Sequence, residues 1–146
     1  NAKEVFGAAA KIDNQLKVVA PVAVEVQQRK LGDALVGKSV EFESGSALLT
    51  RNGMAVLDAL EPIIQEDTST RIEVQGHTDD SGLAGANKVL SQRRAATALE
   101  YLVSKGVEAR RLAARGFGQE QPIADNATPE GRQQNRRIEF LVEERN

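Results

Sequence analysis

Hydrophobic residues recur along the chain at two different spacings, which predicts helices that alternate with strands. Near the start, Val22, Val26, Leu31 and Leu35 are spaced as one face of a helix, and Gly37 follows them as a stop signal. A first helix is therefore predicted between residues 22 and 37.

The next segment combines the strand and helix patterns. SVEF (39–42) alternates apolar and polar residues and predicts a strand, and ESGSA (43–47) reads as a turn. Thr50 is a good N-cap for a helix predicted over 51–66, and RIEVQG (71–76) alternates again as a second strand. The buried stripe predicted for this helix contains Met54, Leu57, Leu60 and Ile64.

The second half of the chain repeats this alternation. A longer helix is predicted over residues 84–105, with Gly106 closing it, and RLAARGFG (111–118) predicts a third strand. A polar loop is expected at 119–134, and RRIEFLVEE (136–144) predicts a last strand. The core positions of this helix and this last strand are Ala95, Leu99, Leu102, Val103, Ile138, Phe140 and Val142.

The order of these elements predicts an α/β (α+β) sandwich with a βαβαββ core, in which helices pack on a small mixed parallel and antiparallel sheet. Strands joined through a helix are expected to be parallel, whereas the last strand has no helix before it and is expected to be antiparallel. Residues 22–146 are assigned to this domain. Residues 1–21 are interpreted as an N-terminal arm or the remnant of a preceding domain, with helical turns at Val5–Ala10 and a short strand at Leu16–Ala20.

Composition narrows the classes of function. The 146-residue chain is 40% hydrophobic and 27% charged, and its net charge of −2 gives no field that favours nucleic acid. Aromatic residues make up only 3%, too few for stacking on single strands, and without cysteine there are no disulfides or thiolate metal sites. No apolar run is long enough to cross a bilayer. Because the chain begins at Asn1, any signal peptide or membrane anchor is expected to lie outside it.

One stretch, HTDDSGLAGANKVLSQRRA (77–95), concentrates the candidate chemistry. Asn87, Ser91 and Arg94 share one face of the predicted helix, and Asp79 comes just past the end of a strand, where ligands of open α/β sheets usually bind. Arginine grips a carboxylate with two parallel hydrogen bonds, and aspartate accepts hydrogen bonds from an ammonium. Asp79 and Arg94 facing each other across a groove would therefore suit the zwitterionic head of an amino acid.

Two alternative interpretations of these residues remain open. Asp79 and Arg94 could pair only with each other, as a structural salt bridge. His77, Asp79 and Asp80 could hold the metal of a metal-dependent hydrolase, although metal sites usually need three or more ligands held by shape. The sequence contains no GxSxG, no cysteine nucleophile and no phosphate-binding loop. We therefore expect no enzyme activity, no catalytic residue and no cofactor.

Several motifs, in the right order, resemble the OmpA-like peptidoglycan-binding domain. They are GHTDDSG (76–82), then Asn87, then LSQRRA (90–95), preceded by VEFESGSALLT (40–50) and followed by GFGQEQPIADNATPEGRQQNRRIEF (116–140). The resemblance covers roughly residues 24–144 and is specific because all of these motifs occur together.

The resemblance implies noncovalent binding of peptidoglycan through the diaminopimelate of its stem peptide. Asp79 and Arg94 match the family's aspartate and arginine, which hold the amino and carboxylate groups of that residue. Further expected contacts are Asn87, Ser81, Gly45, where only backbone groups could contribute, and Arg137. The adjacent Asn135 and Arg136 are interpreted as structural.

The resemblance also implies a periplasmic domain that anchors an envelope or outer-membrane protein to the cell wall. Membrane attachment would then come only from segments outside this chain. A flagellar stator-type domain, which fixes an ion-driven motor to the wall, is the alternative within the same fold.

Overall fold

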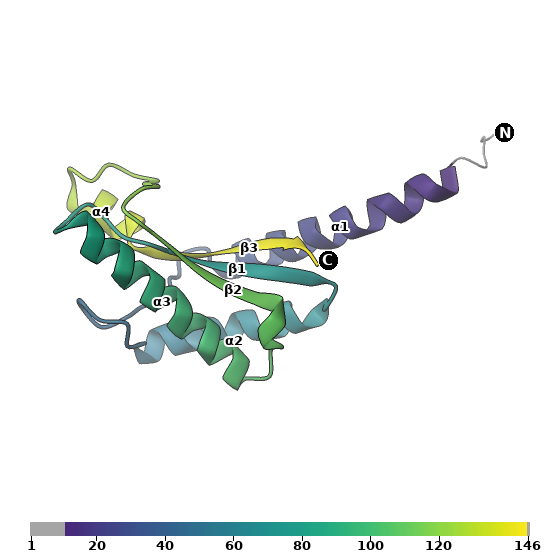
Figure 1. The fold of residues 1–146 in the computed structure, drawn as a ribbon, viewed down its shortest axis with the longest axis horizontal. Helices are drawn as coiled ribbons and strands as arrows, with labels where there is room; N and C mark the ends of the chain where they lie inside the picture. The colour runs from purple at the N-terminus through teal and green to yellow at the C-terminus, as the bar shows by residue number, and fades with distance from the viewer. Residues whose placement is uncertain (1–10, 146) are drawn as a thin grey trace.

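A computed structural model describes the backbone of residues 11–145 and the side chains of residues 22–145. Its elements, in chain order, are α1 (Lys11–Ala34), α2 (Arg51–Glu66), β1 (Thr70–His77), α3 (Ala84–Ser104), the 3-10 helix η1 (Ala109–Arg111), β2 (Leu112–Gly118), α4 (Pro129–Asn135) and β3 (Arg137–Glu144). Figure 1 shows the sheet with α2 and α3 beside it, while α1 extends away from the body toward its N-terminal end.

The sheet has three strands in the order β2-β1-β3. The central strand β1 is parallel to β2, to which α3 connects it, and antiparallel to β3. The predicted α/β sandwich with a small mixed sheet is therefore confirmed.

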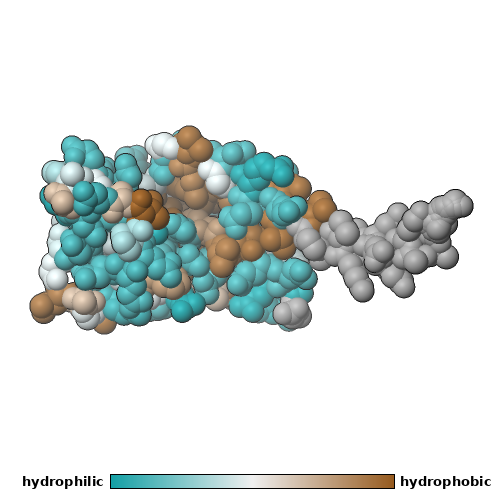
Figure 2. Space-filling model, turned by 90° about the horizontal axis from the view of Figure 1, so that it is seen from above, coloured by the Kyte–Doolittle hydropathy of each residue, from teal (hydrophilic) through white to brown (hydrophobic). Residues whose placement is uncertain are grey.

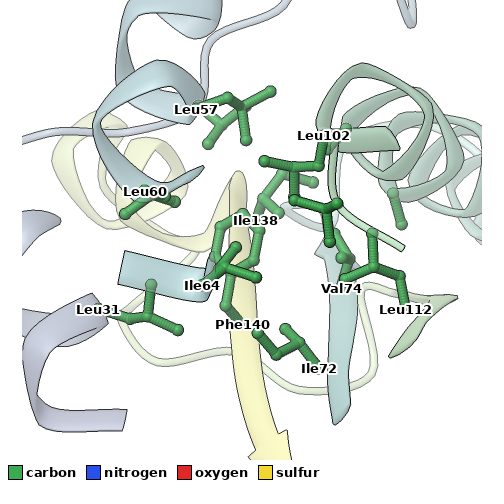
Figure 3. Close-up of a cluster of buried hydrophobic side chains, with 14 of the residues drawn as sticks. Leu31, Leu57, Leu60, Ile64, Ile72, Val74, Leu102, Leu112, Ile138 and Phe140 are labelled. Carbon is green, nitrogen blue, oxygen red and sulfur yellow. The ribbon is translucent and has the colours of Figure 1, made fainter. Parts of the chain in front are cut away.

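The two faces of the sheet differ because the strands alternate in polarity. The helix-covered face carries apolar side chains, and these pack with apolar residues of the helices into one cluster (Figure 3). The buried members labelled there are Leu31, Leu57, Leu60, Ile64, Ile72, Val74, Leu102, Leu112, Ile138 and Phe140. The opposite face carries residues such as Arg71, Glu73 and Glu139, which are only partly buried. Burial of the apolar face drives the folding of this two-layer arrangement.

Helix α3 lies unusually close to the sheet because two strand residues have no side chain. A Cβ atom on Gly76 of β1 would collide with the backbone of Ser91, and one on Gly116 of β2 would collide with the backbone of Gln92. The close approach lets the Ser91 hydroxyl accept a hydrogen bond from Gly118 N at 2.9 Å. This contact fixes the end of β2 against α3 at the same edge of the sheet as the loop after β1.

Each outer edge of the sheet is occupied by the side-chain amide of a helix glutamine. Gln28 of α1 donates to Phe140 O at 2.8 Å and accepts from Val142 N at 2.9 Å, both on β3. Gln92 of α3 donates to Ala114 O at 3.2 Å and accepts from Gly116 N at 2.8 Å, both on β2. Each amide thus makes the pair of hydrogen bonds that a neighbouring strand would make. We call these two interactions the glutamine clasps.

Buried polar contacts join α1 and η1 to the C-terminal end of α2. Gln27 donates to the carbonyl of Ile63 at 2.9 Å and accepts a hydrogen bond from the Thr70 hydroxyl. Arg111, which is 1% exposed, donates to Thr70 O and to Asp67 O, each at 2.8 Å. Carbonyls at the end of a helix lack partners inside the helix, so these side chains satisfy groups that would otherwise be buried without one.

Two strands predicted in the N-terminal half are wrong. Residues 16–20 are helical within α1 and not a strand, and SVEF forms only the isolated bridge between Phe42 and Leu49. The first strand of the predicted βαβαββ core is therefore reduced to that bridge, because residues 39–42 do not join the sheet. The prediction for residues 5–10 lies outside the described residues, and the division at residue 21 stays a prediction, although α1 runs across it.

The predicted loop 119–134 contains a helix that sequence reasoning missed. Helix α4 begins at Pro129, and its N-cap Thr128 accepts a hydrogen bond from Gly131 N. Its polar sequence, PEGRQQN, has no apolar stripe, so hydrophobic spacing gives no signal for it. In α2, the Thr50 cap is confirmed by its hydrogen bond with Gly53 N, whereas Met54 is only partly buried.

The surface seen from above is mostly hydrophilic, with small apolar areas, one of them where α1 joins the body (Figure 2). Val22, which is 46% exposed, lies in this part of α1. Within the described residues, no helix is both long enough and apolar enough to span a membrane.

Candidate functional site

A depression of about 320 Å³ opens beyond the carboxyl end of β1. It is lined by Ser44 and Gly45 of the turn before α2, by Arg94 of α3, and by Arg136 and Arg137, where α4 passes into β3. In Figure 1 this is the end of the molecule where α4 lies near the start of α3. The lining contains three arginines and one carboxylate, that of Glu41, and this excess of positive charge favours an anionic group.

Asp79 is held at this end of the sheet by the loop that follows β1. The residue is 6% exposed, and its Oδ1 accepts a hydrogen bond from Ser81 N at 2.9 Å. Its Oδ2 accepts a hydrogen bond at 2.5 Å from Nη1 of Arg136. Burial alone would raise the pKa of Asp79, but the hydrogen bonds from Ser81 and Arg136 outweigh it and hold the pKa below its usual value. Asp79 is therefore a carboxylate at neutral pH.

Arg94 is fixed in the wall of the depression, whereas Asp79 is not among its lining residues. Its Nε donates to Ser46 O at 2.8 Å, and its guanidinium carbon lies 5.1 Å from the centre of the Phe42 ring. A weaker hydrogen bond joins Nη2 to Glu43 O at 3.4 Å. Nη1 has no partner among the described residues, so part of the guanidinium is available to a ligand that it meets in a fixed orientation.

Arg136 contacts Asp79 and lines the same depression as Arg94. Its side chain is 45% exposed, and Nη1 is the one atom of its guanidinium with a hydrogen-bond partner in the described part of the chain. Burial, and then the positive charge of Arg136, lower the pKa of Arg94, which indicates that the two guanidiniums are within electrostatic reach. The ion pair of Asp79 is therefore with Arg136, and a direct Asp79–Arg94 salt bridge, considered from the sequence, is not formed.

Arg137, in contrast, is committed to structural contacts. Its Nε pairs with Glu139 at 2.5 Å, its Nη1 donates to Asn135 O at 3.1 Å, and its Nη2 donates to Gln121 O at 2.9 Å. The side chain is only 12% exposed, although it contributes to the wall of the depression. Asn135 is fully buried and holds the backbone of Ile123 and Ala124 through its side-chain oxygen.

The remaining predicted contacts lie around the same loop. Asn87 donates to Ser81 O at 2.9 Å and to the side chain of Gln119 at 3.1 Å, so it ties the loop after β1 to the segment after β2. Ser81 itself is exposed. Gly45 lines the depression and has a φ of 66°, a conformation that favours glycine. The structure thus brings Asp79, Arg94 and Gly45 to one end of the molecule and gives Asn87 a positioning contact.

His77 borders the depression from the end of β1. The residue is 3% exposed, stacks on Phe117 with ring centroids 5.1 Å apart, and has no hydrogen-bond partner for either ring nitrogen in the described residues. Burial, and then the charge of Arg137, lower the pKa of His77 to about 4, so the ring is neutral at pH 7. No group of three or more histidine or acidic side chains within the described part of the chain could hold a metal ion, which leaves the His77–Asp79–Asp80 alternative without support.

Arg136 is the site residue whose place sequence reasoning missed. Alternation in the last strand could have distinguished Arg136 from Arg137. Arg136 stands two residues before Ile138 and so lies on the same face as that residue, whereas Arg137 lies on the face of Glu139. The pairing of Arg136 with Asp79 depends on how the end of α4 meets the loop after β1. Spacing along the sequence does not contain that information.

The comparisons with known proteins place the chain in a family. The model of the OmpA family matches residues 41–136. The probable lipoprotein YiaD of Escherichia coli (strain K12) is 35% identical over 136 residues, which cover 82% of this chain and 62% of that protein. The peptidoglycan-binding protein ArfA of Mycobacterium tuberculosis (strain H37Rv) is 36% identical over 110 residues, 75% of this chain and 34% of ArfA. The chain therefore spans less than two thirds of the length of these relatives.

Solved structures show the same architecture. A putative MotB-like protein from Desulfovibrio vulgaris matches with a TM-score of 0.72 and 25% identity, over 88% of this chain and 97% of that one. The peptidoglycan-associated lipoprotein from Burkholderia pseudomallei matches with a TM-score of 0.67 and 27% identity, over 75% and 93% of the two chains. The family match over most of the domain and these structural neighbours agree that the chain belongs to the OmpA family, whose domains are structural and non-enzymatic.

Proposed function

We propose that this domain binds peptidoglycan noncovalently, through the diaminopimelate of the stem peptide, and so anchors an envelope protein to the cell wall. The observation that carries the proposal is the arrangement at one end of the sheet, where Arg136 pairs with the Asp79 carboxylate and lines, together with Arg94, an open depression. A depression of about 320 Å³ is large enough for the head of an amino acid.

In the proposed complex, Arg94 and Asp79 each bind one of the two charged groups of the zwitterion. Arg94 binds the carboxylate with its available donors, and Asp79 accepts hydrogen bonds from the ammonium. Arg136 holds Asp79 in the absence of ligand, and the ammonium takes its place when the ligand binds. Asn87 keeps the loop that carries Asp79 in position, while the exposed Ser81 and the backbone of Gly45 border the ligand. Arg137 supports the wall of the depression through contacts that leave its donors occupied.

The relatives support the wall as the partner. ArfA carries peptidoglycan binding in its name, and the structural neighbour from Burkholderia pseudomallei is a peptidoglycan-associated lipoprotein. Relatives also include outer membrane porin F of Pseudomonas aeruginosa, so we propose an envelope location, on the periplasmic side of the outer membrane. Membrane attachment would come from segments beyond these residues, and tethering would raise the effective concentration at the wall, so that a modest affinity suffices.

A stator-type role is the second candidate. It is favoured by the MotB-like structural neighbour from Desulfovibrio vulgaris and by the periplasmic domain of Helicobacter pylori MotB, which matches with a TM-score of 0.66. Both roles use the same wall-binding site and differ in what the domain is attached to. The sequence of the full-length precursor distinguishes them, because a stator requires a transmembrane helix before the domain.

The proposal is tested by following amide NMR shifts during titration with two stem peptides that differ only in carrying meso-diaminopimelate or lysine as the third residue. In these peptides the α-amino and α-carboxyl groups of that residue are in amide bonds, so lysine offers an ammonium without a distal carboxylate. The diaminopimelate peptide should shift signals near both Asp79 and Arg94, whereas the lysine peptide should leave those near Arg94 almost unchanged. Sedimentation with purified peptidoglycan provides the matching test on the polymer. Equal responses to the two ligands would overturn the role of Arg94, and failure to sediment with the polymer would overturn the function.

A further inference from the structure

The depression that contains Arg94 continues into a second one of about 640 Å³. The two share Ser39, Gln133, Arg136 and Arg137, so together they form a single groove that runs from the turn before α2 past the end of α4. The groove is longer than an amino-acid head group requires, and its far part has no role in the site described above. We call this far part the second subsite.

The second subsite has the chemistry of an anion site. Lys38 and Arg136 line it, and Glu130 is the only carboxylate in its lining as far as the chain is described. Lys38 and the neighbouring glutamines 133 and 134 are exposed, so their ammonium and amide groups reach solvent. Arg136 connects the two parts of the groove, because it lines both and holds Asp79 through a single nitrogen.

The second subsite keeps an excess of positive charge when diaminopimelate is bound. The distal ammonium and carboxylate of that residue match Asp79 and Arg94, and this displaces Arg136 from Asp79. In the second subsite, Arg136 and Lys38 are then two cations beside one carboxylate, that of Glu130. In a stem peptide, diaminopimelate is flanked by further carboxylates: the α-carboxylate of the D-glutamate before it and, after it, the carboxylate at the peptide terminus.

We propose that Arg136, released from Asp79, and Lys38 bind a second carboxylate of the stem peptide, adjacent to diaminopimelate. This inference rests on the proposed function and extends it, because it makes the ligand a peptide and not a single residue. Arginine and lysine side chains bind carboxylates through charge-assisted hydrogen bonds, which in a solvent-exposed groove contribute modestly and weaken with salt.

Calorimetry with a ligand series tests the proposal. Free meso-diaminopimelate is compared with a stem tetrapeptide that has both flanking carboxylates, and with two tetrapeptides in which one or the other is amidated. The complete peptide should bind roughly two- to fivefold more tightly than diaminopimelate, as expected for an exposed charge pair, and one amidation should abolish that gain. The amidated position that abolishes it identifies the carboxylate. A gain that survives both amidations, or no gain at all, overturns the second subsite.

The matched variants are Lys38→Ala, inside the subsite, and Lys30→Ala, which removes the same charge from α1 beside Glu66. Lys38→Ala should leave the affinity for diaminopimelate unchanged and remove the extra affinity for the complete peptide, whereas Lys30→Ala should change neither. If the wild-type protein binds diaminopimelate but Lys38→Ala keeps the full peptide gain, the second subsite is wrong and the proposed function stands. If the wild type binds neither ligand, the proposed function falls, and the subsite with it.

Discussion

Asp79 and Arg136 are 57 positions apart in the sequence and are joined at 2.5 Å between Oδ2 and Nη1. The acid comes from the loop after β1, and the arginine comes from the residue that links α4 to β3. Side-chain exposures of 9% for Asp79 and 45% for Arg136 show that the acid is sheltered and that the arginine is partly open to solvent. In the proposed complex, a ligand ammonium would therefore replace the arginine without leaving a buried cation unpaired.

The first prediction concerns the charge on Asp79. Asp79→Asn keeps the size of the side chain and its acceptor for Ser81 N, but it removes the charge that a ligand ammonium needs. We expect binding of diaminopimelate to weaken at least tenfold, since a sheltered charge-assisted contact contributes roughly 1.5–3 kcal/mol. The free energy of unfolding should fall by only about 1 kcal/mol, because the partner left behind is solvent-exposed.

Asp80→Asn is the matched control for this prediction, because it changes the neighbouring aspartate, which is exposed. It should leave both the affinity and the unfolding free energy within error of the wild type. Calorimetry and urea denaturation measure the two quantities. If Asp79→Asn binds as tightly as Asp80→Asn, the assignment of Asp79 to the ammonium is wrong.

The sequence predicts the individual residues of the site better than their pairing. Asp79 and Arg94 could be placed at one edge of the sheet because strand ends and helix periodicity fix positions locally. Their positions relative to Arg136 could not be predicted, because these depend on the path of residues 119–135. That segment is a polar loop and helix and has no hydrophobic pattern. Tertiary contacts of Asn135 hold that segment.

The fold could be predicted where a hydrophobic pattern is long and regular. Helices α2 and α3 and the three strands of the sheet were predicted within a few residues of their bounds. The strand predicted at residues 39–42 is wrong. An alternating pattern of apolar and polar residues indicates a half-buried extended segment, but it does not show that a partner strand is present. The strand predicted at residues 16–20 is also wrong, because a short apolar run such as LKVVA fits a strand and a helix equally well.

His77 provides a prediction about stability and pH. Folding lowers its pKa from 6.5 to about 4, so the folded state favours the neutral ring. The resulting stabilisation is fully present above pH 6.5 and is lost as the pH falls from 6.5 toward 4. A difference of this size corresponds to at most about 3 kcal/mol. His77→Phe keeps an aromatic ring to stack on Phe117 and removes the titrating group.

The comparison of wild type with His77→Phe isolates the contribution of His77 to the pH dependence of stability, because the other titrating groups are common to both proteins. Urea denaturation at intervals from pH 7.5 to 4.5 should show wild type losing stability relative to the variant as the pH falls. At pH 7.5 the two should differ by about 1 kcal/mol or less, as expected for an aromatic exchange of similar volume. Parallel curves over the whole range would show that His77 is not held neutral by the fold.

The contact of α3 with β1 leads to a third prediction, which uses two glycines. Gly76→Ala would force a methyl group into the backbone of Ser91, so we expect a loss of roughly 2–3 kcal/mol in the free energy of unfolding. Gly85→Ala lies in the first turn of α3 with no atom within 4 Å of the added carbon, and it should gain up to about 1 kcal/mol from helix propensity. Thermal unfolding monitored by circular dichroism measures both effects, and opposite signs are the expected result.

The last prediction concerns the glutamine clasps. Gln28→Ala removes the two hydrogen bonds on β3, and Gln92→Ala removes the two on β2. Two neutral hydrogen bonds contribute roughly 1–3 kcal/mol together, so each variant should be destabilised by an amount in that range. Unpaired strand edges also template pairing with other chains, so the double variant should self-associate as its concentration rises.

Light scattering after size-exclusion chromatography measures this association. Gln134→Ala serves as the control, because it removes an exposed glutamine from α4. It should stay as stable and as monodisperse as the wild type under the same conditions. Leu141 of β3, which is 41% exposed, lies on the edge that Gln28 protects, so Gln28→Ala should associate more readily than Gln92→Ala. A double variant that stays in the same oligomeric state as the wild type would show that the helices themselves shield the sheet edges and that the clasps contribute only stability.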